Sequence, residues 1–368
     1  MKSDRPMKHI SRNAALMALA AGLALTGAGC NQDLKSRAER GNPKAQYQLG
    51  YRYYSGEMET RNFSEAVKWF RKAAEQDNRM AQYSLGLAYL NGEGVPANKA
   101  EAAKWFRKAA DRGDAAAQYT LGTIYFEGLD GVTNVAGGLK LIQAAAERGE
   151  ADAQVFLGRT YSVGESVRED PAAAFKWFKL AAAQGDATGQ YHLGLCFRDG
   201  TGVKADAAQA VKWFKLAVAG GDHDAQYDLG FCYYEGLGVT SNRTTALTWF
   251  RKAAGEEEPR AQFQLGTMYD SGDGVPKDSV EALKWYRKAA DNDDEDALVM
   301  LARIYQKGDG VPADPVEAYK YFTLAIDAGR KVAALPQGAL ARTLTPEQLA
   351  EAKKRVEVAR QKRAKREG

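Results

Sequence analysis

The sequence predicts an all-α protein, a right-handed α/α solenoid of eight 36-residue helix-turn-helix repeats with a C-terminal capping helix. Three observations predict this fold. A Leu-Gly pair recurs every 36 residues from Leu49 to Leu265, variants of the KWFRKAA segment at 68–74 recur at the same step, and an Asn or Asp stands six residues before each variant. A fixed period of this length is typical of stacked supersecondary units, so the repeat decides the fold before any other feature.

The first 29 residues have the composition of a secretory signal peptide. Lys8 and Arg12 precede an apolar run at 14–25, and small residues follow at 26–29. A membrane-spanning helix needs about 20 apolar residues, and this run is shorter. We therefore expect an exported protein rather than one held by a transmembrane helix.

Cys30 follows these small residues directly, as the acylated cysteine does in bacterial lipoproteins. Such signals usually carry Leu three residues before the cysteine, where this chain has Gly27. We expect a lipid anchor at Cys30 that attaches the chain to the outer membrane, facing the periplasm. The alternative is simple cleavage near Ala28, which would give a soluble periplasmic or secreted protein.

Residues 30–41 resemble the second half of a repeat, and the full repeats occupy 42–329. In the first helix of the first repeat, Ala45, Leu49 and Tyr53 lie at i, i+4 and i+8, on one helical face. Asn42 precedes this helix and can accept a hydrogen bond from a free first-turn N–H group. The sequence therefore predicts an amphipathic helix that begins just after Asn42.

The second helix of each repeat has its own apolar face. In the first repeat Ala66, Trp69, Phe70 and Ala73 lie at i, i+3, i+4 and i+7. The residues predicted to cap this helix in successive repeats are Asn62, Asn98, Asn134, Asp170, Asp206, Asn242, Asp278 and Asp314. One hairpin cannot bury both apolar faces, so each repeat must pack on its neighbours.

The AQYxLG start, the GxGV turn at 92–95 and the WFRKAA helix together resemble the Sel1-like repeat family. The resemblance covers about 42–329 and implies a tetratricopeptide-like α-solenoid. It also implies a non-catalytic scaffold or adaptor of the bacterial cell envelope that binds a protein or peptide partner. In the third repeat Leu141 and Ile142 replace Trp-Phe, and Gly137 and Gly138 are expected to loosen its second helix.

The repeat pattern stops after Gly329, and residues 330–368 are predicted to form a capping helix and a basic tail. Thr345 can cap a helix that begins at about Pro346, and Gln348 stands where a capping-box partner belongs. Residues 351–368 carry eight Lys or Arg. These cations suit a helix C-terminus, and an anionic polymer or lipid is the alternative partner.

The residues favour neither catalysis nor a cofactor or metal site. Ser-x-x-Lys, Lys-Thr-Gly and His-Glu-x-x-His are absent from the chain. Cys196 and Cys232 occupy the same position in neighbouring repeats, too far apart for a disulfide, and are expected to be partly buried thiols. The alternative is a β-lactam or cell-wall hydrolase, which the resemblance to cysteine-rich Sel1-like proteins raises, but their cysteine pairs are missing here.

Binding is expected where the repeats differ. Basic residues are not concentrated on the repeats, which disfavours a nucleic-acid surface. A stripe along the first helices changes from repeat to repeat and is predicted to line a concave partner groove with exposed aromatic anchors. Its candidate residues are Gln48, Tyr51, Phe156, Arg159, His192, Leu195, Asp228 and Phe231. The alternative is that this stripe is an unconstrained, solvent-facing surface.

Overall fold

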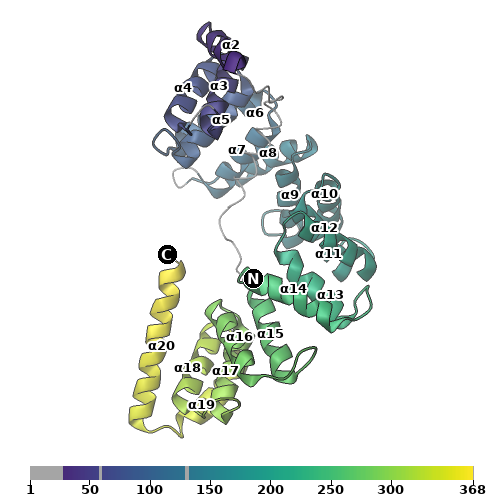
Figure 1. The fold of residues 1–368 in the computed structure, drawn as a ribbon, viewed down its shortest axis with the longest axis vertical. Coiled ribbons are helices and arrows are strands. Elements are labelled where there is room, and N and C mark those ends of the chain that lie inside the picture. The colour runs from purple at the N-terminus through teal and green to yellow at the C-terminus, as the bar shows by residue number, and fades with distance from the viewer. Residues whose placement is uncertain (1–27, 58–59, 129–131, 368) are drawn as a thin grey trace. The chain divides into compact units, whose positions relative to one another are not determined.

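The computed structural model describes residues 28–57, 60–128 and 132–367, with the backbone alone for 28–32 and 367. The helices pack as two compact units, one up to Glu169 and one from Asp170. Figure 1 labels the helices along the chain. The side chain of Cys30 and most of the expected signal peptide at 1–29 lie outside the described residues.

The first unit contains eight helices in the part of the chain that is described. They are α2 (Ala28–Glu39), α3 (Pro43–Ser55), α4 (Phe63–Glu75), α5 (Arg79–Asn91), α6 (Lys99–Asp111), α7 (Ala115–Glu127), α8 (Val135–Glu147) and α9 (Ala151–Val163). Each A-type helix (α3, α5, α7) packs on the B-type helix that follows it (α4, α6, α8), and each B-type helix packs on the next A-type helix. This order confirms the predicted all-α repeat packing.

The second unit continues the pattern. Its helices are α10 (Pro171–Ala183), α11 (Ala187–Asp199), α12 (Ala207–Ala219), α13 (Asp224–Glu235), α14 (Arg243–Gly255), α15 (Pro259–Ser271), α16 (Ser279–Asp291), α17 (Glu295–Lys307), α18 (Pro315–Asp327), the 3-10 helix η2 (Lys331–Ala333), α19 (Ala334–Ala341) and α20 (Pro346–Glu367). Here α11, α13, α15 and α17 are A-type helices, and α10, α12, α14, α16 and α18 are B-type helices. Within the described residues, no helix combines the length and apolar character that a membrane crossing requires.

The helices begin where the capping residues predict. The Asn42 Oδ1 atom accepts from the Ala45 N–H group at 2.9 Å, and the Asn62 Oδ1 atom accepts from the Glu65 N–H group at 3.0 Å. These bonds satisfy first-turn donors that have no partner within the helix. Glu150 stands at the equivalent position before α9 but makes no capping bond through its side chain.

A phenylalanine on the B-type helix fills the core of most repeats. Phe70 and Phe214 are buried, and each ring lies against a glycine of the preceding A-type helix. A Cβ atom added at Gly50 would lie 2.7 Å from the Phe70 Cδ1 atom, closer than atoms can pack. The glycine of the Leu-Gly pair is therefore required by the aromatic ring opposite it.

The tryptophan of the repeated heptapeptide has a different environment from the phenylalanine beside it. Trp69 and Trp105 are buried, whereas Trp213 is half-buried. A lysine one turn later covers the indole ring, with the Lys72 Nζ atom 4.3 Å from the centre of the Trp69 ring. The phenylalanine is therefore buried more completely than the tryptophan beside it.

The third repeat packs by close approach of two backbones. Ile142 takes the place of the phenylalanine and is fully buried. A Cβ atom at Gly138 would lie 2.6 Å from the Gly122 carbonyl oxygen. Helix α8 is continuous despite its glycines, and Gly138 allows its backbone to approach that of α7 closely.

A buried glutamine on the A-type helix connects it to the repeat before. The Gln46 Nε2 atom donates to the Ala38 carbonyl oxygen at 3.1 Å, and Gln262 donates to the Ala254 carbonyl oxygen at 3.2 Å. Gln82, Gln118 and Gln154 make the same bond to the residue eight positions earlier. The acceptor is a carbonyl in the last turn of the preceding helix, which lacks an intrahelical donor.

The oxygen of this glutamine is satisfied in some repeats only. The Gln46 Oε1 atom accepts from the Gln76 Nε2 atom at 2.7 Å, and the Gln262 Oε1 atom accepts from the Asn292 Nδ2 atom at 3.0 Å. Among the described residues, the Oε1 atom of Gln118 is buried without a partner. Arg148 occupies the position that Gln76 and Asn292 hold in their repeats, and its guanidinium group does not bond this oxygen.

Helix α20 begins at Pro346, as predicted, and Thr345 and Gln348 form the reciprocal capping box. Ala352 and Val356 are its most buried side chains. Three arginines hold α20 against the last repeats: Arg355 pairs with Glu317 at 3.1 Å, Arg360 with Asp327 at 2.8 Å and Arg363 with Asp293 at 3.1 Å. Helices η2 and α19, which precede α20, were not predicted from the sequence.

Candidate functional site

The predicted groove residues of the first unit are less exposed than expected. Tyr51 is only 8% exposed and lies in the same apolar cluster as Leu87 of α5. The prediction that Tyr51 is an exposed anchor is therefore wrong. Gln48 is half-buried and Arg159 is exposed.

Phe156 is also half-buried, because it packs on the neighbouring A-type helix. Its ring lies edge-on to that of Phe126 in α7, with ring centres 5.3 Å apart. Edge-to-face packing of this kind stabilises a contact beyond the apolar area it buries. Phe156 thus joins adjacent repeats, and part of its side chain remains accessible.

The second unit places its predicted residues in two settings. His192 stacks on Phe178 of α10, with ring centres 4.7 Å apart and planes tilted by 13°. Leu195 and Phe231 hold the same repeat position in α11 and α13, and both are half-buried. His192 therefore packs between repeats, whereas Leu195 and Phe231 keep part of their apolar surface accessible.

Asp228 is buried, with 2% of its surface exposed, and it joins α13 to α11. Its carboxylate accepts from the Tyr191 hydroxyl at 3.0 Å and from the Arg198 Nη1 atom at 2.5 Å. The prediction that Asp228 is a free groove residue is wrong. A buried carboxylate needs such partners, because without them its desolvation would cost several kcal/mol.

Arg260 of α15 extends this arrangement to a third helix. Its guanidinium carbon lies 4.3 Å from the centre of the Tyr227 ring, and its Nε atom is 2.6 Å from the Glu258 Oε1 atom. We call Tyr191, Arg198, Tyr227, Asp228 and Arg260 the Asp228 cluster. One signal in the sequence points to it, a carboxylate at 228 where other repeats carry uncharged residues or a histidine.

The charges of the cluster oppose one another. Burial raises the pKa of Asp228, and the guanidinium groups of Arg198 and Arg260 counter that rise. Burial and the neighbouring carboxylate of Asp228 raise the pKa of Tyr191, so its hydroxyl remains a proton donor at neutral pH. Asp228 thus holds two hydrogen-bond donors in place, the Tyr191 hydroxyl and the Arg198 guanidinium group. The guanidinium groups of Arg198 and Arg260 remain partly exposed.

The described residues provide little for covalent or metal chemistry. Cys196 and Cys232 are free thiols, as predicted, and are more deeply buried than expected; burial raises the pKa of both to about 11. A thiol acts as a nucleophile in its deprotonated form, which is scarce at such a pKa. No group of three or more His, Cys, Asp or Glu in the described part of the chain could hold a metal ion.

Comparison with known proteins agrees with the geometry. The Sel1 repeat family matches eight segments: 43–78, 79–114, 115–150, 151–186, 187–222, 223–256, 259–294 and 295–329. The crystal structure of c5321, a protective antigen of uropathogenic Escherichia coli strains with an SLR fold, is similar to this chain. That match has a TM-score of 0.72 and 36% identity over 90% of this chain and 71% of the other.

Two further proteins are similar to this chain, one over most of its length and one over a short segment. A Sel1 repeat protein from Oxalobacter formigenes matches with a TM-score of 0.62 and 31% identity, over 89% of this chain and 93% of its own. The secretory immunoglobulin A-binding protein EsiB of Escherichia coli is 48% identical over 42 residues, which span 11% of this chain and 9% of EsiB. Sel1-repeat proteins generally act in protein–protein interactions and are typically non-catalytic. With eight matched repeats, this chain belongs to the Sel1 repeat family.

Proposed function

We propose that the chain is a non-catalytic interaction scaffold of the bacterial cell envelope, which binds a peptide or protein partner on the A-type helices of its second unit. The observation that carries this proposal is the face made by Leu195, Phe231 and Arg260, which we call the A-helix face. Leu195 and Phe231 keep part of their apolar surface accessible, and the Arg260 side chain is 46% exposed. Aromatic and arginine side chains are the groups that most often provide binding energy at protein interfaces.

The Asp228 cluster gives this face a fixed geometry. Asp228 holds Arg198, and Arg260 lies over Tyr227, so neighbouring A-type helices are joined by polar contacts as well as by packing. A side chain that is already ordered loses less conformational entropy when a partner binds. The partner is therefore expected to contact this face without a large rearrangement.

A photo-crosslinking experiment in whole cells tests the proposal. Benzoylphenylalanine is placed at Leu195, on the A-helix face, or at Leu216, which is 41% exposed on the B-type helix of the same repeat. We expect a partner to be captured from position 195 and not from position 216, with both variants melting like the wild type. Capture at position 216 alone would refute binding on the A-helix face.

The envelope location is proposed from the sequence of residues 1–30 and needs its own test. Cells grown with a clickable palmitate analogue should label the wild-type chain and should not label Cys30→Ser. An unlabelled wild-type chain would contradict a lipid anchor, and the A-helix face would remain to be tested in a protein released by cleavage near Ala28.

A further inference from the structure

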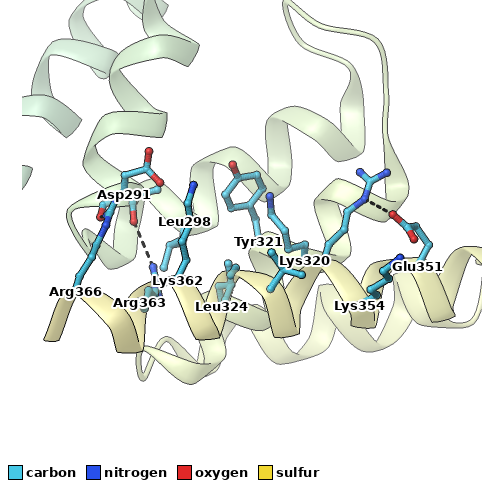
Figure 2. Close-up of a pocket in the computed structure, with 14 residues that line it drawn as sticks. Asp291, Leu298, Lys320, Tyr321, Leu324, Glu351, Lys354, Lys362, Arg363 and Arg366 are labelled. Carbon is cyan, nitrogen blue, oxygen red and sulfur yellow. Dashed lines mark hydrogen bonds and ion pairs between the residues drawn. The ribbon is translucent and has the colours of Figure 1, made fainter. Parts of the chain in front are cut away.

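A pocket lies between α20 and the last two repeats (Figure 2). Its volume is about 390 Å³, within the range of about 300–1,000 Å³ that is usual for ligand sites. Leu298, Tyr321 and Leu324 line the side formed by the repeats, and Lys354, Val358 and Lys362 are among the residues that line it from α20.

The pocket has an apolar surface that α20 does not cover completely. Val358 is 57% exposed although it lines the pocket from α20, and Tyr321, which lines it from α18, is half-buried. Leu324, which also lines the pocket from α18, is 3% exposed. An apolar side chain inserted beside Val358 would therefore remove further apolar surface from water, which is favourable.

The cations around the pocket divide into paired and unpaired groups. Arg355 and Arg363 pair with acids of the repeats, and Arg366 donates to the Asp291 carbonyl oxygen at 2.5 Å. Lys354 and Lys362, in contrast, have no ion pair or hydrogen bond with any described residue. These two lysines are therefore available to an anionic partner.

The two lysines are placed symmetrically about the apolar surface. Lys354, Val358 and Lys362 follow one another at intervals of four residues, so they lie on one side of α20. At a rise of 1.5 Å per residue, the two lysine Cα atoms are about 12 Å apart along the helix. The pocket thus presents an apolar centre between two cations.

The carboxylates that line the pocket do not neutralise this pair. Glu351 is bonded to Arg355 at 2.9 Å, and Lys320 pairs with Glu317 while its Nζ atom lies 4.0 Å from the centre of the Tyr321 ring. Asp291 lines the end of the pocket near Arg366 (Figure 2). The positive charge of Arg366 offsets this carboxylate, so the charges of Lys354 and Lys362 remain in excess.

We propose that this pocket binds an extended peptide segment of a partner, in which two carboxylate side chains flank an apolar one. Four residues of extended chain span about 13 Å, which matches the separation of Lys354 and Lys362. The apolar side chain packs on Val358 and Tyr321, and each carboxylate pairs with one lysine. A lipid fits less well, because it offers one anionic head group at one end of its apolar chain.

Fluorescence anisotropy with a blocked, labelled peptide Glu-Ala-Leu-Ala-Glu tests this site on the purified full chain. We expect Lys354→Gln/Lys362→Gln to bind about tenfold more weakly than the wild type, as for the loss of two exposed ion pairs. The matched control is Lys353→Gln/Lys365→Gln, which removes the same charge from exposed positions of α20 that do not line the pocket. This control should bind like the wild type.

The apolar part of the proposal has a separate readout. Val358→Ser keeps every charge and should also weaken binding, and the peptide Glu-Ala-Ser-Ala-Glu should bind more weakly than the leucine peptide. Equal loss of binding in both lysine variants would overturn the proposal in favour of general attraction to a basic helix.

Inorganic phosphate and phosphatidylglycerol vesicles serve as competing probes. Failure of the peptide to bind the wild type refutes the proposal, and phosphate or vesicle binding that requires Lys354 and Lys362 would then assign the site to phosphate or lipid. Leu195 and Phe231 do not line the pocket. A negative result for peptide binding therefore leaves the crosslinking test of the A-helix face unaffected.

Discussion

Gly194 of α11 lies where the Phe214 ring of α12 packs, and a Cβ atom there would be 2.6 Å from the Phe214 Cε1 atom. Because the neighbouring ring is fully buried and cannot move freely, we expect Gly194→Ala to destabilise the protein by about 1–3 kcal/mol. The matched control is Gly255→Ala in α14, where nothing lies within 4 Å of the added atom. That change should stabilise the helix by about 0.5–1 kcal/mol. Urea unfolding distinguishes the two, and equal effects would contradict the role assigned to Gly194.

Glu150 gives the stability a dependence on pH. Burial, followed by the charges of Asp152 and Asp114, raises its pKa to about 7 from an ordinary value of 4.5. The folded state therefore holds the proton more tightly than the unfolded state, and the stability that protonation provides is lost as the pH rises from about 4.5 to about 7. Glu150→Gln places an uncharged amide there at every pH, so the variant should not lose this stability. Its melting temperature should match the wild type near pH 4 and exceed it at pH 8, whereas a difference independent of pH would contradict the assignment.

At the scale of the helices, the buried glutamine acts like a helix cap, because its amide donates to a carbonyl at the end of the preceding helix. In Gln262 both polar atoms are bonded, whereas the Gln118 oxygen has no partner among the described residues. Gln262→Met removes two hydrogen bonds of a buried side chain, each worth about 0.5–1.5 kcal/mol, and should therefore cost about 1–3 kcal/mol. Gln118→Met also removes an unsatisfied oxygen, so its cost should be smaller. Chemical denaturation of both variants tests this order, and a larger loss for Gln118→Met would contradict it.

The elements could largely be predicted from the sequence because their ends carry local signals. Asn42 and Thr345 mark the starts of α3 and α20, since a cap acts through residues only two or three positions away. Helix α19 was missed because it is short, contains Pro336 and lies outside the repeat period. The role of Gln46 was missed because its acceptor is a carbonyl of the preceding helix, which periodicity does not reveal.

The candidate site was less predictable than the helices. A stripe at helical spacing identifies a face, but not whether the neighbouring repeat covers it. Tyr51 and Asp228 satisfied the same pattern as Leu195 and Phe231, yet both are buried. Their burial depends on contacts between helices that are far apart in sequence, such as the bond from Tyr191 to Asp228.

At the scale of the whole molecule, stability in such arrays is a sum over repeats and their nearest neighbours. Phe214→Ala empties the core of one repeat and should cost about 3–5 kcal/mol. Hydrogen exchange should then show lost protection in α11–α14 and unchanged protection in α3–α6. Leu216→Ala, two residues away and 41% exposed, is the control and should change little. Uniform loss along the chain in the Phe214 variant would contradict nearest-neighbour coupling.

The glutamine bond to a main-chain carbonyl also bears on how the chain changes over generations. A carbonyl is present in every repeat whatever its side chains, so a duplicated or deleted repeat finds its acceptor at the new junction without a second mutation. Gln46 makes this bond to Ala38 of α2, which precedes the first full repeat, just as Gln82 makes it to Ala74 within the array. The number of repeats, and with it the reach of the scaffold, can therefore drift by whole copies while each junction remains intact.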